Sequence, residues 1–411
     1  MKTTFRDVFS VAEFRALWLA QLLSVAGDQL ARVALTVLVY DRTHSAFLAA
    51  LTFVTSVVPV FIGGVTLAWL ADRYPRRSVM IACDLARCVL VLLMAIGGVP
   101  LAALVVLLFV VTLIGAPFSS ARAAIYPDVL DGDRYVMGTA ITLTTNQFAQ
   151  VIGFAAGGAI VGFLGIRTSL VIDAATYAVS ALLVRIWVSF RPAANAGASA
   201  GRIGGLSNPL PAIRLVFGTP ALRIPMLFGL LMAFHDSPEG VATPLAAALG
   251  GGAATVGLLL AAQTFGSSAG ALIFGRLVPA AWQRRLTGPL AIAACAALCL
   301  FALSPRLPGA LAILGVSGLL TCFQLSANAS FVRAVPQEQR SQAFGLAQGS
   351  ISLGQGIMML IAGAAAQAFA PAHVIAACGA VGAVAAGLIA LSQLGDSRRS
   401  TAWRAPVARE D

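Results

Sequence analysis

The chain has 411 residues, of which 59% are hydrophobic and only 10% are charged, and its mean hydropathy is +0.89. A soluble domain keeps roughly a quarter of its residues charged, so this composition excludes a water-soluble protein. The net charge of +11 comes from arginines spread over many short loops, which argues against a nucleic-acid partner. We therefore expect the chain to lie in a lipid bilayer.

A helix needs about 20 residues to cross a hydrocarbon core of about 30 Å, and twelve apolar runs reach that length. In chain order they cover residues 14–40, 45–71, 79–98, 100–123, 136–163, 167–189, 222–248, 253–277, 287–304, 308–332, 340–368 and 372–394. These runs do not alternate apolar and polar residues, so a membrane β-barrel is excluded. The predicted fold class is an all-α membrane protein with twelve transmembrane helices.

The sequence predicts two six-helix pseudo-repeats, because residues 190–208 are rich in Gly, Ala, Ser and Pro and cannot form a membrane helix. Basic loops recur at matching places in the two halves, as at Arg73 and Arg276. The predicted parts are an N-terminal bundle over 1–190, a cytoplasmic linker over 191–221, a C-terminal bundle over 222–394 and a cytoplasmic tail over 395–411. Within the linker, residues 210–217 show helical spacing, which indicates either a short surface helix or an extension of the seventh helix.

Most of the 27 basic residues fall on one side of the membrane if the N-terminus is cytoplasmic. Lys and Arg are retained on the cytoplasmic side of short loops. The first apolar run is too long for a cleavable signal and is expected to remain as the first helix. The predicted location is the bacterial cytoplasmic (inner) membrane, crossed many times, with both termini in the cytoplasm.

The loop after the second predicted helix carries the most specific motif. Residues 68–77, AWLADRYPRR, resemble the signature G-x-L-A-D-R-x-G-R-R/K of the major facilitator superfamily, with Ala68 and Pro75 in place of two glycines. The segments FRALWLAQLLSVAGDQ, DRYPRRSVMIACDLAR, ARAAIYPDV and SPEG are similar to the branch of macrolide-efflux and enterobactin-exporter proteins. This resemblance implies two six-helix halves around a central cavity, and transport with no cofactor.

The same resemblance implies that the motif loop belongs to a cytoplasmic gate. Charges at the mouth of a two-state bundle can pair in one state and separate in the other, or the arginines can serve only to anchor the topology. On the next helix, Asp84 and Arg87 are placed to pair and support the loop. The predicted gate residues are Asp72, Arg73, Arg76, Arg77, Asp84, Arg87 and Asp128.

Charges deeper in the helices indicate proton coupling, because an ionised group inside the membrane is costly unless it faces a cavity or a partner. In the first helix, Asp28 and Arg32 are spaced to form an ion pair, which is either a proton-coupling site or a permanent structural pair. In the seventh, Pro238 and Gly240 are expected to interrupt the helix beside two acids. The predicted coupling residues are Asp28, Arg32, Asp236 and Glu239.

Uncharged polar side chains on several helices are candidates for the substrate cavity, with hydrogen bonding between helices as the alternative. These candidates are Gln21, Ser24, Thr142, Asn146, Gln150, His235, Gln324 and Asn328. For Gln348, Ser352 and Gln355 in the eleventh helix we favour hydrogen bonding between helices. Asp173 is expected to be a cap or surface residue near the outer end of the sixth helix.

The predicted function is export of an amphipathic organic compound (a drug, antibiotic, siderophore or other natural product) by alternating access in exchange for protons. Proton-coupled uptake of a small metabolite and a non-transporting membrane receptor or scaffold remain as alternatives. The chain has no HExxH, GxSxG or phosphate-binding loop, so neither an enzyme nor a metal site is expected. The expected partners are the lipid bilayer, a small amphipathic substrate and protons, and the expected state is a monomer.

Overall fold

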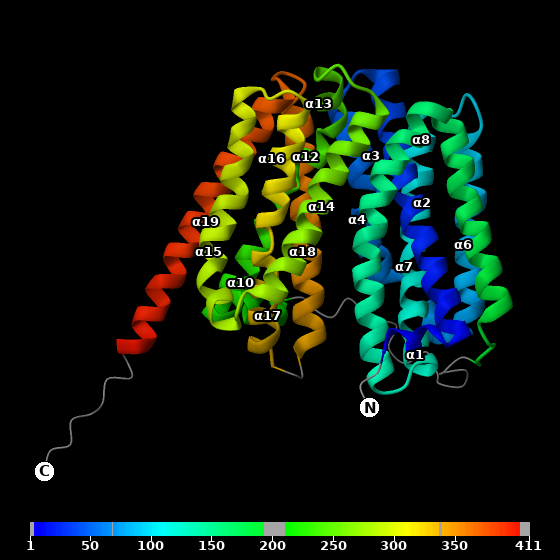
Figure 1. The fold of residues 1–411 in the computed structure, drawn as a ribbon, viewed down its shortest axis with the longest axis horizontal. Helices are drawn as coiled ribbons and strands as arrows, with labels where there is room; N and C mark the ends of the chain where they lie inside the picture. The colour runs from blue at the N-terminus through cyan, green and yellow to red at the C-terminus, as the bar shows by residue number, and fades with distance from the viewer. Residues whose placement is uncertain (1–3, 68, 193–209, 337–338, 403–411) are drawn as a thin grey trace, which may run out of the picture. The chain divides into compact units, whose positions relative to one another are not determined.

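The computed structural model describes residues 4–67, 69–192, 210–336 and 339–402, and every regular element in them is helical. Figure 1 shows long helices joined by short loops. The first helices are α1 (Phe5–Phe9), α2 (Ala12–Thr43), α3 (Ala46–Thr55), α4 (Val58–Thr66), α5 (Leu70–Arg73), α6 (Arg76–Ala95), α7 (Leu101–Val129) and α8 (Asp133–Trp187). The others are α9 (Leu210–Gly218), α10 (Pro220–Leu230), α11 (Met232–His235), α12 (Ser237–Gly240), α13 (Ala242–Ala248), α14 (Ala253–Leu277), α15 (Ala280–Leu298), a 3-10 helix (Cys299–Leu303), α16 (Leu307–Leu320), α17 (Phe323–Ala334), α18 (Arg340–Ala365) and α19 (Pro371–Ala402).

Ten helical segments in the described part of the chain are long and apolar enough to cross a membrane. The twelve predicted passes are consistent with this number, because one segment contains two passes and another pass is broken. The 55-residue helix α8 would be about 80 Å long if it were straight, far more than a bilayer needs. Its backbone leaves the helical region at Gly165, where φ is 81°. This kink divides α8 into two arms, which correspond to the predicted fifth and sixth helices.

The predicted seventh helix is broken, as its proline and glycine indicate. Residues 220–248 form the four short helices α10, α11, α12 and α13 instead of one long helix. Each break frees backbone groups from the helical hydrogen-bonding pattern. Asp236 therefore lies at a break between α11 and α12, and Glu239 lies in the one-turn helix α12.

Prolines mark the beginnings of many helices. Pro75, Pro100 and Pro279 directly precede α6, α7 and α15, and α10 and α19 begin with a proline. Proline suits these places because its fixed φ matches a helix and the first turn needs no N–H donor.

The predicted linker is described only in part. Residues 193–209 lie outside the described chain, whereas α9 is a helix separate from α10, and its predicted place on the membrane surface stays a prediction.

The N-terminus of α1 is held by a reciprocal cap outside the membrane helices. The backbone N–H and the hydroxyl of Thr4 both donate to the Asp7 carboxylate at 2.8 Å. These hydrogen bonds, that from the backbone first, hold the pKa of Asp7 below its usual value.

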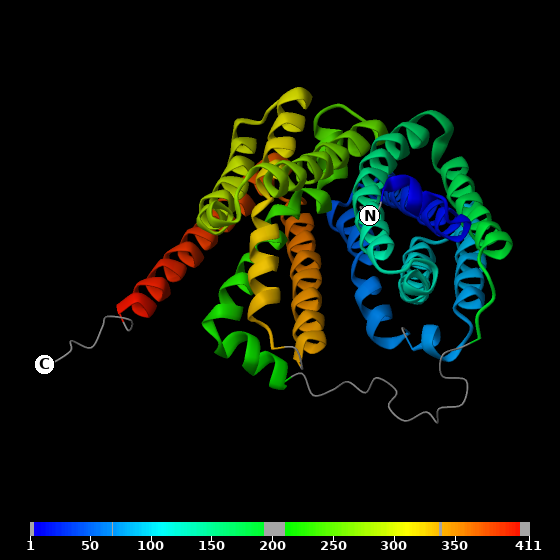
Figure 2. The same cartoon turned by 60° about the horizontal axis from the view of Figure 1, so that its bottom comes forward.

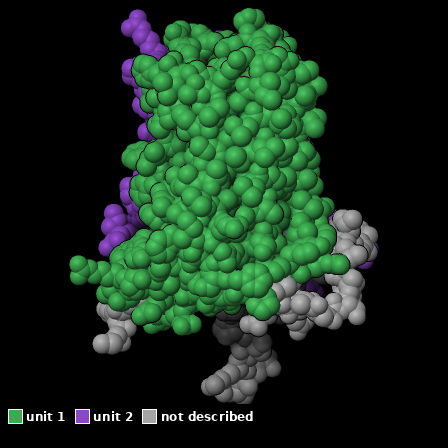
Figure 3. All heavy atoms as spheres, turned by 90° about the vertical axis from the view of Figure 1, so that its right-hand side faces the viewer, with its two compact units in different colours: residues 1–207, 238–265, 359–371 green, residues 208–237, 266–358, 372–411 purple. Residues whose placement is uncertain are grey.

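The helices form two compact units. Unit 1 comprises residues 1–207, 238–265 and 359–371, and unit 2 comprises residues 208–237, 266–358 and 372–411. Figure 3 shows the closely packed surface of unit 1. Inside unit 1, α2 lies between the two arms of α8 (Figure 2). The predicted division at residues 190–208 stays a prediction.

Small residues allow close helix packing in unit 1, as the glycines of the fifth predicted helix indicate. A Cβ atom at Gly157 would lie 3.0 Å from the Leu30 Cα of α2. A Cβ at Gly158 would lie 2.8 Å from the Gly257 Cα of α14. These separations leave no room for larger side chains, so the glycines bring α8 against both neighbours.

Candidate functional site

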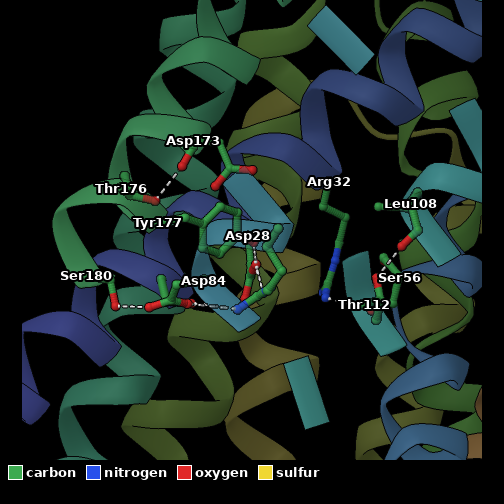
Figure 4. Close-up of polar contacts among 12 residues, drawn as sticks. Asp28, Arg32, Ser56, Asp84, Leu108, Thr112, Asp173, Thr176, Tyr177 and Ser180 are labelled. Carbon is green, nitrogen blue, oxygen red and sulfur yellow. Dashed lines mark hydrogen bonds and ion pairs between the residues drawn. The ribbon is translucent and has the colours of Figure 1, made fainter. Parts of the chain in front are cut away.

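An ion pair between α2 and α6 lies at the centre of the candidate site. Arg87 Nη2 lies 2.7 Å from Asp28 Oδ1, and the side chain of Arg87 is only 5% exposed. A second guanidinium nitrogen of Arg87 donates to Ser24 Oγ at 3.2 Å. From α8, Tyr177 donates its hydroxyl to the same Asp28 oxygen and places its ring 4.2 Å from the guanidinium carbon of Arg87. Arg87 of α6 is therefore held by side chains of α2 and α8, and Figure 4 shows two of them, Asp28 and Tyr177.

The structure corrects the predicted partner of Asp28. Arg32 donates to the Ser56 carbonyl oxygen at 3.2 Å and lies over the ring of Phe53. Figure 4 shows Arg32 pointing away from Asp28 toward Ser56. The helical spacing of Asp28 and Arg32 permits a pair, but tertiary packing brings Arg87 closer to the carboxylate.

The predicted pair of Asp84 and Arg87 is present, with Asp84 Oδ1 3.9 Å from Arg87 Nη1. Asp84 is fully buried, and Ser180 on α8 donates to its other oxygen at 2.6 Å. The sequence interpretation assigned this pair to the cytoplasmic gate, and that role stays a prediction. Arg87 is eleven residues beyond Arg76, about 16 Å along α6, and its contacts are with the Asp28 site.

Asp173 on the second arm of α8 is a third acid at this site. It is 0% exposed, so its expected position as a cap or surface residue is wrong. It lies within electrostatic range of Asp28 and Arg87. Across the described residues, no group of three or more His, Cys, Asp or Glu side chains is placed to hold a metal ion.

Glu239 interacts electrostatically with Arg32, although the two are far apart in sequence. The charges of Glu239 and Asp28 both act on Arg32. All three residues belong to unit 1. Arg32 is thus within electrostatic range of two of the predicted coupling acids.

Asp236, the other predicted coupling acid, belongs to unit 2. Gln355 of α18 donates to its Oδ2 at 2.5 Å, which confirms a hydrogen bond between helices for this glutamine. His235 Nε2 lies 3.9 Å from the other oxygen of Asp236. The opposite ring nitrogen of His235 lies 3.1 Å from Ser317 Oγ, and His235 is only 1% exposed. Its place is therefore inside the packed unit.

Two of the predicted gate residues, Arg76 and Asp128, belong to a charged network at one end of unit 1. Arg76 Nη1 lies 2.8 Å from Asp128 Oδ2 and also donates to the Ala124 carbonyl oxygen. Arg77 donates to the carbonyl oxygen of Arg185, and Arg73 lies over the ring of Trp69. The side chain of Asp72 lies outside the described part of the structure.

Sequence reasoning missed two residues of this network. Glu13, at the start of α2, pairs with Arg191 at 2.8 Å. Arg191 also donates to the Asp128 carbonyl oxygen at 3.5 Å, and Ser189 donates to Glu13. The sequence shows that Glu13 lies near the start of a helix. It does not show that Glu13 pairs with Arg191, because the two residues are 178 positions apart.

Two predicted cavity residues meet in a pocket of about 280 Å³ within unit 2. Gln324 and Asn328 of α17 line it, together with Gln348 of α18. The other lining residues are Pro225, Met226, Gly229, Leu325, Ala327, Phe331, Phe344, Ala347 and Ile351. The lining thus combines carboxamides with apolar and aromatic groups and includes no charged residue.

The other cavity candidates have different surroundings. Ser24 contacts Arg87, as described above, and Thr142 is buried, with its hydroxyl 2.9 Å from the Gly138 carbonyl oxygen and 3.3 Å from Tyr126. The remaining three are partly exposed. They are Gln21, Asn146 and Gln150.

Comparison with known proteins gives the family. The model of the Major Facilitator Superfamily matches residues 17–236 and 240–408, which is nearly the whole chain. The chain belongs to this superfamily. It is therefore a multi-pass membrane transporter, and the predicted fold class and family are confirmed.

Among its relatives, the enterobactin exporter EntS of Salmonella typhi is 26% identical over 402 residues, which cover 94% of this chain and 93% of that protein. EntS of Citrobacter koseri is 26% identical over 268 residues, which cover 64% of this chain and 63% of that protein, just under two thirds of its length.

Solved structures have the same fold. A POT family transporter in complex with 5-aminolevulinic acid matches with a TM-score of 0.73 at 12% identity, over 94% of this chain and 96% of that one. A bacterial homologue of the human lysosomal transporter Spinster, inward-facing and occupied, matches with a TM-score of 0.72 at 17% identity, over 96% and 98%. At these identities the likeness establishes the fold alone.

Proposed function

We propose that this Major Facilitator Superfamily transporter exports an amphipathic organic compound by alternating access in exchange for protons. The observation that carries the proposal is the partly buried ion pair between Asp28 and Arg87. Both residues lie within membrane-spanning helices, where an ionised group is costly without a partner or a cavity. Such charges commonly mark proton pathways in transporters.

The geometry around Asp28 suits reversible protonation. Its side chain is 35% exposed whereas that of Arg87 is 5% exposed, so the acid is the more open member of the pair. A proton on Asp28 removes the charge that attracts the guanidinium and weakens the contact between α2 and α6. A site whose helix contacts depend on one proton can bias a two-state bundle.

The pocket in unit 2 supports an amphipathic substrate. Its apolar and aromatic lining suits a lipophilic body, and its three carboxamides can orient hydroxyl or carbonyl groups. The relatives named enterobactin exporter favour export and a siderophore or similar natural product as the compound. We further propose that the protein lies in the bacterial inner membrane with both termini in the cytoplasm and acts as a monomer.

The test is transport by the purified protein in proteoliposomes that contain a pH-sensitive dye. Lipophilic antibiotics, dyes and siderophores are added one at a time, and internal pH and compound flux are followed. We expect at least one compound to move in the direction opposite to protons. Asp28→Asn should abolish the substrate-dependent pH change, whereas Asp41→Asn, at the exposed end of the same helix, should keep it.

Movement of the compound and protons in the same direction would overturn export by exchange and support uptake. Binding of a compound without any flux would support a receptor instead. A pH response that persists in Asp28→Asn would remove Asp28 from the coupling reaction.

A further inference from the structure

Asp173 has an environment unlike that of the other acids. Its side chain is fully buried, and neither carboxyl oxygen has a hydrogen-bond partner among the described residues. The nearby hydroxyl of Thr176 donates to the backbone carbonyl oxygen of Asp173 at 2.7 Å. A buried ionised carboxylate without hydrogen bonds is strongly disfavoured.

The Asp173 carboxyl group contacts α2 directly beside Asp28. A Cβ atom at Gly27 would collide with Asp173 Oδ1 and would lie 2.5 Å from Thr176 Oγ1. Figure 4 shows Asp173 and Asp28 on facing helices. Because Gly27 has no side chain, it leaves the space in which Asp173 reaches the ion-pair site.

The partners of the three acids differ in number. Asp28 has Arg87 at 2.7 Å and the Tyr177 hydroxyl. Asp84 has the Ser180 hydroxyl at 2.6 Å and Arg87 at 3.9 Å. Arg87 is the one guanidinium that contacts this group of three acids, so it cannot balance three negative charges. The acid without a hydrogen bond, Asp173, is the one that best holds a proton.

We propose that Asp173 is a second proton-binding site, which holds a proton while Asp28 is paired with Arg87. The other titratable groups that face Asp173 are Tyr177 on its own helix and the Cys88 thiol on α6. Neither supplies a positive charge, so Arg87 is the cation that can stabilise an ionised Asp173.

During proton exchange, a step that rests on the proposed function, Asp173 and Asp28 share one proton. When the O–H bond of Asp173 breaks and a proton binds to Asp28, the negative charge passes from Asp28 to Asp173. Arg87 then exchanges one carboxylate partner for the other, and the total charge of the cluster is unchanged. The cluster thus has two arrangements that differ in which helix, α2 or α8, Arg87 binds.

The test is infrared difference spectroscopy of the purified full-length protein in lipid nanodiscs at neutral pH, with ¹³C-labelled aspartate to identify the carboxyl C=O band of protonated aspartic acids. We expect the wild type to show such a band, Asp173→Asn to lose it and Asp41→Asn to keep it. Absence of the band from the wild type, or its full survival in Asp173→Asn, would overturn the proposal.

Two further variants test the contact and the exchange. Gly27→Ala should shift the Asp173 band because it displaces the carboxyl group, whereas Gly64→Ala, which has open space around it, should not. Asp28→Asn should weaken the Asp173 band because it leaves Arg87 available to Asp173. Unchanged bands in Gly27→Ala and Asp28→Asn would refute the contact and the exchange, respectively. None of these measurements needs a substrate. If Asp173 holds a proton but the protein transports no compound, the proposed function fails and this inference stands.

Discussion

Arg87 is the residue on which the candidate site depends. It contacts Asp28, Asp84 and Ser24 through its nitrogens, and its guanidinium plane lies against the ring of Tyr177. A guanidinium can make these contacts at once because it is planar and has several donors in fixed directions. An ammonium group has the same charge, but it lacks the paired N–H donors and the flat face that contacts the ring of Tyr177.

We therefore predict that Arg87→Lys impairs coupling although the positive charge is kept. Loss of one hydrogen bond to a charged group, worth about 1.5–3 kcal/mol, should slow substrate-dependent proton movement at least about tenfold. The measurement is the rate of internal pH change in proteoliposomes. Arg42→Lys is the control, because Arg42 is exposed and donates to the Val99 carbonyl oxygen. Wild-type rates in Arg87→Lys would show that charge alone is sufficient.

The helices of unit 1 are positioned by close backbone contact. Gly157 and Gly158 lie on α8 at the places where α2 and α14 approach. In a bilayer, helix association depends on packing and hydrogen bonds more than on the hydrophobic effect, so small residues at the contact have a large influence. This packing places Tyr177, Ser180 and Asp173 of α8 against the acids and bases of α2 and α6.

We predict that Gly158→Ala destabilises the protein by about 1–3 kcal/mol, because overpacking forces the backbones apart. Its Cβ atom would lie 2.6 Å from the Ala253 carbonyl oxygen. Gly162→Ala on the same helix is the matched control, since its nearest neighbours are 3.8 Å away. Thermal unfolding in detergent should show a lower Tm for the first variant only. Equal Tm values would mean that the contact tolerates a methyl group.

For the molecule as a whole, the distribution of arginines predicts the orientation in the membrane. The loops assigned to the cytoplasm contain most of the 27 basic residues. Helix α8 passes the membrane twice, and its start and end therefore lie on the same side. The gate network of Arg76, Asp128, Glu13 and Arg191 is then expected at the cytoplasmic end of unit 1.

This orientation predicts the behaviour of reporter fusions. Green fluorescent protein fused after residue 411 should fluoresce, because it folds in the cytoplasm, and alkaline phosphatase fused after Gly98 should be active outside. The reciprocal fusions should be inactive and serve as controls. Phosphatase activity at the C-terminus would invert the proposed topology.

Local properties of the chain were sufficient to predict the fold class, the twelve passes and the break in the seventh helix, because apolar length, proline and glycine act over a few residues. They also drew attention to Asp28, Asp84 and Arg87, since charges in apolar runs stand out. Tertiary structure alone decided the pairing: Asp28 binds a base 59 residues away in place of one four residues away. It also decided that Asp173 is buried beside Gly27. Both outcomes depend on how α2, α6 and α8 pack together, and the spacing of residues within one helix contains no information about that packing.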